Sequence, residues 1–128
     1  MKALLMSSDP SVRESIALAI GNIGRRTGEP MEFIEAANGE IGVRATWRES
    51  PDMVIADEMA SRAGAFALAR DLRSATEPYE GAIVILLDRP HDAWLARWSG
   101  ADAWFVKPFD PFELADTLIE LTTTKETA

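Results

Sequence analysis

Two charged residues of opposite sign stand where apolar segments of this chain end. Asp57 closes the apolar run 53–56, and Lys107 follows the apolar run 104–106 and precedes Pro108. If both runs are parallel strands, the carboxylate and the ammonium reach the same edge of one sheet. A carboxylate beside a lysine can accept a phosphoryl group, because the lysine neutralises charge on the moving oxygens. The pair therefore predicts a phosphate-handling site.

Ser7 and Ser8 follow the first apolar run, 3–6, where further carboxylates of such a site are expected. Part of the chemistry of a phosphate-handling site is therefore missing. With no metal to shield it, Asp57 is expected to face Lys107 in a plain ion pair. The alternative is that the serines form a hydrolytic serine–lysine arrangement with Lys107, although helix capping and loop hydrogen bonds are the simpler role for them.

Length and charge exclude several functions. The 128 residues fit one domain, which we expect to span 1–121 and to be followed by a polar tail, 122–128. The net charge of −8, from 21 acidic against 13 basic residues, argues against direct binding to nucleic acid or to a membrane. The longest apolar run, 82–87, is too short to span a bilayer. Because the chain has no cysteine, it offers no disulfide or thiolate metal site, which suits a cytoplasmic protein.

Strand and helix patterns alternate along the whole chain. Five such units in succession predict an α/β fold, a single doubly wound five-stranded parallel sheet with five helices on its two faces. Asp9 and Pro10 read as the cap and first turn of the first helix. In the last helix the apolar residues expected to pack inward are Phe112, Ala115, Leu118 and Ile119. The predicted strands are 2–6, 31–34, 53–56, 82–87 and 104–106.

Four segments carry a family resemblance. The segments 4–14, 34–39, 51–57 and 100–110, the last containing Gly-Ala-Asp and then Lys-Pro-Phe-Asp, resemble the receiver domain of two-component response regulators. The resemblance implies a flavodoxin-like strand order 2-1-3-4-5 and phosphorylation of an aspartate by a partner histidine kinase. It also implies a bound Mg²⁺ and output through a face made of the fourth helix, the fifth strand and the fifth helix.

Carried over by position, Asp57 takes the place of the phosphoacceptor and Lys107 that of the lysine that pairs with it, before a cis peptide bond to Pro108. The family places two acidic residues after the first strand to hold Mg²⁺, and Ser7 and Ser8 stand there in this chain. Two further departures concern the switch positions. Leu87 replaces a hydroxyl residue that contacts the phosphoryl group, and Trp104 replaces the usual Tyr or Phe.

These departures predict that Mg²⁺ binds weakly or not at all, because two neutral hydroxyls cannot supply the charge of two carboxylates. The ligands that the resemblance leaves in place are Asp57 and the backbone carbonyl of Met59. An alternative remains open, in which Asp9, Glu58 or Asp88 replaces the missing acidic pair.

Three of the four tryptophans, Trp94, Trp98 and Trp104, fall on the predicted fourth helix and fifth strand. Trp94 and Trp98 are four residues apart and share a helix face. The simplest role is core packing, but so short a helix cannot easily bury both. We expect an interaction face there that binds a protein partner or forms a homodimer through the fourth helix, fifth strand and fifth helix.

The sequence thus predicts an atypical receiver that acts in signal transduction by protein contact and is not an enzyme, with no required cofactor. One alternative is an ordinary receiver, a phosphoprotein that a histidine kinase phosphorylates on Asp57. A second is a flavodoxin-like small-molecule binder or enzyme, which the lack of a glycine in Ser7-Ser8-Asp9-Pro10 disfavours.

Overall fold

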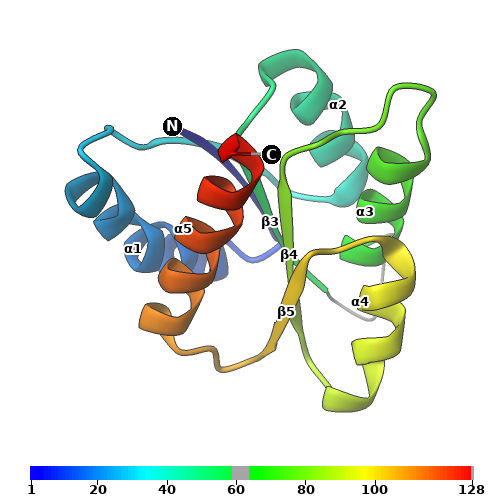
Figure 1. The fold of residues 1–128 in the computed structure, drawn as a ribbon. Helices are drawn as coiled ribbons and strands as arrows, with labels where there is room; N and C mark the ends of the chain where they lie inside the picture. Colours follow the sequence, from blue (N-terminus) through cyan, green and yellow to red (C-terminus); the bar gives the residue numbers. More distant parts are fainter. Residues whose placement is uncertain (59–63, 128) are drawn as a thin grey trace.

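The computed structural model describes residues 1–58 and 64–127 (Figure 1). Five parallel strands form one sheet in the order β2-β1-β3-β4-β5, which confirms the predicted flavodoxin-like topology. The strands are β1 (Lys2–Met6), β2 (Glu32–Ala36), β3 (Met53–Asp57), β4 (Ala82–Leu87) and β5 (Ala103–Val106). The helices are α1 (Pro10–Thr27), α2 (Gly39–Glu49), α3 (Ala65–Ser74), α4 (Ala93–Ser99) and α5 (Pro111–Thr127), and the short 3-10 turn η1 (Pro90–Asp92) precedes α4.

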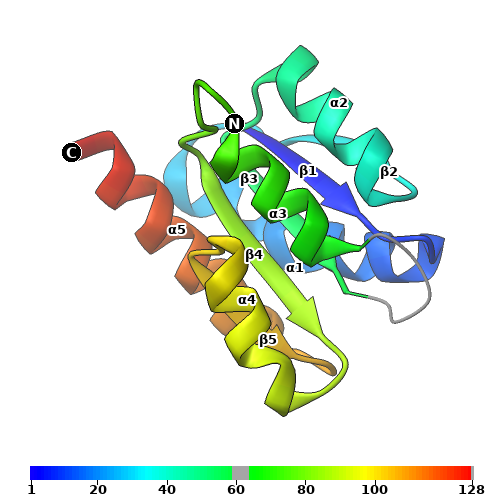
Figure 2. The same cartoon turned by 90° about the vertical axis from the view of Figure 1, so that its right-hand side faces the viewer.

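Helices cover both faces of the sheet. Helices α1 and α5 lie on one face, and α2, α3 and α4 lie on the other (Figures 1 and 2). A hydrophobic core lies on each face of the sheet, and alternate residues of the inner strands pack into one core or the other. In β3, Val54 packs on the α2–α3–α4 side and Ile55 on the α1–α5 side. All six residues of β4 are buried, as expected for a strand covered on both faces.

Local sequence signals set the helix ends near the functional edge. The Asp9 side chain accepts a hydrogen bond from the Ser11 amide, and Pro10 is the first residue of α1. The Asn38 side chain caps α2 in the same way by accepting from the Ile41 amide. Both caps follow the carboxyl ends of strands, so each helix starts at the same edge of the sheet.

The structure differs from the sequence predictions in α5. Phe112 does not pack inward: it is 74% exposed, because Leu114, Ala115 and Leu118 form the stripe that meets the core. Helix α5 also continues through Thr127, and the Thr122 side chain is buried and donates to the Leu118 carbonyl. The boundary expected after residue 121 therefore does not coincide with a helix end.

Candidate functional site

Asp57 lies at the carboxyl end of β3, in the middle of the sheet, with its side chain fully buried. Its carboxylate is held from two sides. The Ser7 hydroxyl donates to Oδ2 at 2.8 Å, and the Lys107 ammonium forms an ion pair with Oδ1. The structure thus brings the predicted acid–lysine pair together, and both carboxylate oxygens have a donor.

Lys107 follows β5, and its backbone amide donates to the Leu87 carbonyl at 2.8 Å, which fixes the lysine beside the end of β4. Its ammonium also lies 2.9 Å from Asp88 Oδ1, so one cation bridges two carboxylates. Burial lowers the pKa of Lys107, but the hydrogen bonds to Asp57 and Asp88 outweigh it, and the pKa lies above its ordinary value. Lys107 is therefore held as a cation. The Lys107–Pro108 peptide bond is cis, as the resemblance implies.

Ser7 is fully buried and is fixed on all sides. Its amide donates to the Ala36 carbonyl at 3.1 Å, and its hydroxyl accepts from the Asp9 amide at 3.0 Å. The Arg13 guanidinium donates to the Ser7 carbonyl at 2.6 Å. Because the hydroxyl donates to Asp57, the geometry does not favour the serine–lysine alternative, in which it would serve as a nucleophile. Ser8, the next residue, is exposed.

The other carboxylates proposed as metal ligands have different partners. Asp9 is exposed and caps α1, and the hydrogen bonds from Ser11 lower its pKa. Glu58 is turned toward the start of α3, where its Oε2 accepts from the Phe66 amide at 3.3 Å, and burial raises its pKa. Asp88 contacts Lys107. Met59 lies outside the described residues. Among the side chains that the structure describes, in 1–58 and 64–123, no group of three or more His, Cys, Asp or Glu residues is arranged to hold a metal ion.

The two residues that the resemblance places at switch positions, Leu87 and Trp104, pack against the core. Leu87 is fully buried at the end of β4, and a leucine offers no hydroxyl to this edge of the sheet. Trp104 is half-buried against the α2–α3–α4 core, and the Arg97 guanidinium lies 5.6 Å from the centre of its ring. Arg89, on the same edge, pairs with Asp92 at 3.2 Å.

Helix α4 carries two indoles on its outer surface. Trp94 is 65% exposed and Trp98 is 55% exposed, whereas Ala96 and Ser99 face inward. The expectation that so short a helix does not bury both indoles is therefore confirmed, and both of them are exposed. The Arg70 guanidinium of α3 lies over Trp98, 4.9 Å from the ring centre.

Curated relatives show to which family this fold and site belong. An uncharacterized response regulatory protein of Mycobacterium tuberculosis (strain ATCC 25618 / H37Rv) is 30% identical over 121 residues, which cover 94% of this chain and 90% of the relative. This chain belongs to the response regulators and folds as their receiver domain. A probable transcriptional regulator, ycf27, of Porphyridium aerugineum is 28% identical over 113 residues, and the match covers 88% of the receiver chain but 44% of ycf27. No family model matches the chain.

Solved structures agree with the receiver fold. The BeF3-activated N-terminal receiver domain of Klebsiella pneumoniae RstA superposes with a TM-score of 0.75 at 27% identity, covering 95% of this chain and 98% of that one. A putative response regulator from Chloroflexus aurantiacus gives a TM-score of 0.80 at 22% identity, covering 95% and 97% of the two chains. No helix within the described part of the receiver is long and apolar enough to cross a membrane.

Three contacts of the receiver were missed at the sequence level. The sequence offers Asp88 only as a possible metal ligand, yet its carboxylate contacts Lys107. The Ser7–Asp57 hydrogen bond joins residues fifty positions apart, and the Arg70–Trp98 contact joins two helices. For the first, a signal existed: β4 and β5 are neighbours, so the residues that follow them approach each other.

Proposed function

We propose that this receiver is atypical: it acts in signal transduction by contact with other proteins, and Mg²⁺-dependent phosphorylation of Asp57 is weak or absent. The observation that carries the proposal is the state of the Asp57 carboxylate. Oδ2 accepts from Ser7 and Oδ1 contacts Lys107, so a protein donor already occupies one acceptor position on each oxygen that a phosphoryl group or a metal would need.

The donor set supports this proposal. Mg²⁺ dehydrates reluctantly and is held in proteins by carboxylates. The described side chains that donate to the Asp57 carboxylate are a neutral serine and a lysine cation, and a cation repels a metal ion. Lys107 neutralises the buried carboxylate in place of a divalent ion, so the site needs no metal for its charge balance. Leu87 removes a further hydrogen-bond donor for a phosphoryl group.

The second candidate is an ordinary receiver that a histidine kinase phosphorylates on Asp57. The contact between Asp57 and Lys107 favours it, because a lysine beside the acceptor is what phosphoryl transfer requires. In that case a carboxylate oxygen attacks the phosphoryl group through a lone pair that Ser7 and Lys107 do not use. The two candidates share the fold and differ in whether Asp57 is phosphorylated.

Labelling with acetyl phosphate separates the two candidates. We expect no phosphoprotein by intact-protein mass spectrometry with or without Mg²⁺, and no change in the unfolding temperature of the parent when millimolar Mg²⁺ is added. Stoichiometric labelling that requires Mg²⁺ and is lost in Asp57→Asn would instead establish the ordinary receiver. An Asp57→Asn variant that folds but loses signalling output would also contradict phosphorylation independence.

A gain-of-function variant tests the cause. Ser7→Asp with Ser8→Asp creates a cluster of carboxylates beside Asp57 whose mutual repulsion destabilises the fold in the absence of metal. The double variant should be less stable than the parent, and it should regain stability with Mg²⁺ by an amount set by the metal affinity. If Mg²⁺ stabilises the parent equally, then Asp9, Glu58 or Asp88 already supplies ligands and the atypical assignment is wrong.

For partners, we propose a protein that contacts α4, β5 and α5, with a homodimer through the same face as one form of this contact. Exposed indoles on α4 support the choice of surface, because aromatic side chains commonly anchor protein interfaces. Sedimentation velocity over a range of concentrations tests the homodimer. A monomer at every concentration, with the same sedimentation coefficient for the parent, Trp94→Ser and Trp98→Ser, would exclude self-association.

A further inference from the structure

The outer surface of α4 alternates aromatic and cationic side chains. Successive residues of a helix are about 100° apart, so Trp98 lies about 40° to one side of Trp94 and Arg97 about 60° to the other. Trp98 meets Arg70 of α3, and Arg97 lies over Trp104 of β5. Helices α3 and α4 lie side by side on this face (Figure 2). We call the surface formed by Arg70, Trp94, Arg97 and Trp98 the α3–α4 face.

The two arginines of this face lack carboxylate partners among the described residues. The chain has 21 acidic residues against 13 basic ones, so carboxylates are abundant, and other arginines such as Arg13 and Arg73 pair with them. Among the side chains that the structure describes, in 1–58 and 64–123, no carboxylate lies within ion-pair distance of Arg70 or Arg97, and each guanidinium lies over an indole ring instead. A guanidinium over a ring can still donate its N–H groups to a carboxylate.

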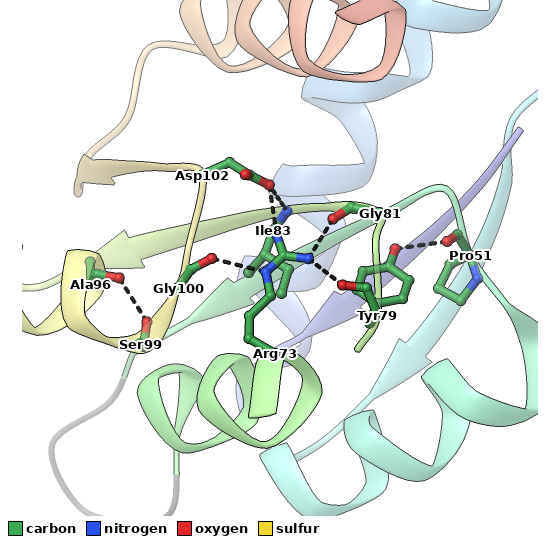
Figure 3. Close-up of polar contacts among 9 residues, drawn as sticks. All are labelled: Pro51, Arg73, Tyr79, Gly81, Ile83, Ala96, Ser99, Gly100 and Asp102. Carbon is green, nitrogen blue, oxygen red and sulfur yellow. Dashed lines mark hydrogen bonds and ion pairs between the residues drawn. The ribbon is translucent and has the colours of Figure 1, made fainter. Parts of the chain in front are cut away.

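The α3–α4 face is also held in place from within. Arg73, one turn after Arg70 on α3, points inward and donates to the carbonyls of Tyr79, Gly81 and Gly100 at 2.6, 3.0 and 3.0 Å (Figure 3). Its Nη2 lies 2.8 Å from Asp102 Oδ2. Through Gly100, which ends α4, and Asp102, which precedes β5, this guanidinium ties α4 to α3.

A surface that is rigid before binding loses little conformational entropy when a partner docks. The Arg73 contacts fix the spacing between α3 and α4, so Arg70 and Trp98 are already together in the free protein. Tryptophan and arginine are the residues that most often dominate the energy of protein interfaces. Composition and rigidity both favour a binding role for this face over a purely structural one.

We propose that the α3–α4 face binds an acidic segment of a partner protein. An apolar side chain of that segment sits on Trp94, and its carboxylates accept from Arg70 and Arg97. Charge complementarity selects this occupant, because the arginines are cations without carboxylate partners in the described chain. The inference rests on the proposed function, action by protein contact, and it names the chemistry of the partner.

Indole N–H resonances of the ¹⁵N-labelled full chain test the proposal. The probe is a synthetic peptide of alternating glutamate and leucine, and the control peptide has lysine at each glutamate. We expect the acidic peptide to shift the indole resonances of Trp94 and Trp98 and to leave that of Trp47, an exposed tryptophan on α2, unchanged. Binding should weaken with added salt, because exposed charges are screened.

Charge-reversal variants complete the test. Arg70→Glu and Arg97→Glu should each weaken binding by about tenfold or more, the size expected for a charge-assisted hydrogen bond. Arg44→Glu, at an exposed arginine on α2, makes the same change in net charge on the side of α3 that faces α2 rather than α4, and it should leave the affinity unchanged. In the same assay, acetyl phosphate with Mg²⁺ should leave the affinity of the parent for the acidic peptide unchanged. An affinity that changes when Asp57 becomes phosphorylated would contradict phosphorylation independence but not the docking surface, so the two failures are distinguishable.

Four results would overturn the proposal. The first is equal binding of the lysine peptide, which would make the face apolar without charge selectivity. The second is an equal loss of affinity in Arg44→Glu, which would reduce the effect to net charge. The third is an absence of shifts at Trp94 and Trp98 up to millimolar peptide. The fourth is a change of these two resonances with protein concentration alone, which would assign the face to a second copy of the chain.

Discussion

Replacing Lys107 by methionine should be far more destabilising than replacing its partner Asp57 by asparagine. In Lys107→Met the Asp57 carboxylate stays buried with only the Ser7 hydroxyl as a donor, and an uncompensated buried charge costs about 3–5 kcal/mol. For a chain of this length, with an unfolding entropy of about 2.1 cal/mol/K per residue, that cost lowers the unfolding temperature by about 11–19 °C.

In Asp57→Asn, Lys107 still pairs with Asp88, and the Lys107 side chain is 22% exposed, so its ammonium is neither unpaired nor completely removed from solvent. The asparagine oxygen can accept from Lys107, and we expect a cost of about 1 kcal/mol. The variant that combines Asp57→Asn with Lys107→Met should be more stable than Lys107→Met alone by about 2 kcal/mol, since it removes the buried, unpaired carboxylate.

Urea unfolding at pH 7, followed by circular dichroism, measures all three variants. Lys2→Met is the matched control, because Lys2 pairs with Glu49 at 3.8 Å and both side chains are well exposed. An exposed pair contributes less than about 1 kcal/mol. If Lys107→Met costs no more than Lys2→Met, or if the double variant gains nothing over Lys107→Met, the ion pair does not hold the site.

Three further predictions concern the same fold. The pKa of Lys107 is raised in the folded protein, so the stability that the ammonium contributes is fully present below its ordinary pKa of about 10.4 and is lost as the pH rises through the folded pKa. The difference in unfolding free energy between the parent and Lys107→Met should therefore shrink above about pH 10.4. A constant difference up to about pH 11.5 would contradict this. Tyr79→Phe removes the 2.7 Å hydrogen bond to the buried Pro51 carbonyl and should cost about 1–3 kcal/mol by urea unfolding, with a change below 0.5 kcal/mol contradicting a structural role for the hydroxyl. Gly100→Ala should destabilise the fold by about 1–2 kcal/mol, because φ is +93° and the new Cβ would meet Arg73 Cγ at 2.6 Å. Gly21→Ala, where a Cβ meets nothing within 4 Å, should instead stabilise α1 by about 0.5–1 kcal/mol. Equal effects of the two substitutions on the free energy of unfolding would refute the argument.

The strand order and the edge that carries the site could be predicted because each depends on local signals. β4 is apolar at every position, and Asp9-Pro10 marks the start of α1. Once these elements alternate, short right-handed connections leave few topologies, and the carboxyl ends of β3 and β5 must deliver Asp57 and Lys107 to one edge. These signals alone therefore predict the contact between Asp57 and Lys107.

The remaining contacts depend on side-chain placement across elements, which periodicity does not encode. Phe112 was placed inward because aromatic residues are usually buried, yet the phase of α5 is set by Leu114 and Leu118. Glu58 directly follows Asp57 but turns to the amides at the start of α3, because consecutive residues at a strand end point to opposite sides. Arg70 and Trp98 meet only because α3 and α4 lie side by side.

Strand β5 is fixed at both of its ends, and this bears on how the receiver works. At its start, Asp102 pairs with Arg73 and accepts from the Ile83 amide at 2.9 Å, which ties the entry of β5 to α3 and β4. At its end, Lys107 bridges Asp57 and Asp88, and its backbone amide donates to the Leu87 carbonyl.

A conformational switch that moves β5 and α4 would have to break a charged contact at one end of β5 or the other. A ligand can shift such an equilibrium only by its difference in affinity for the two states. Under the proposed function, neither Mg²⁺ nor a phosphoryl group supplies that difference. The contacts at the two ends of β5 then favour a single, constantly presented α3–α4 face.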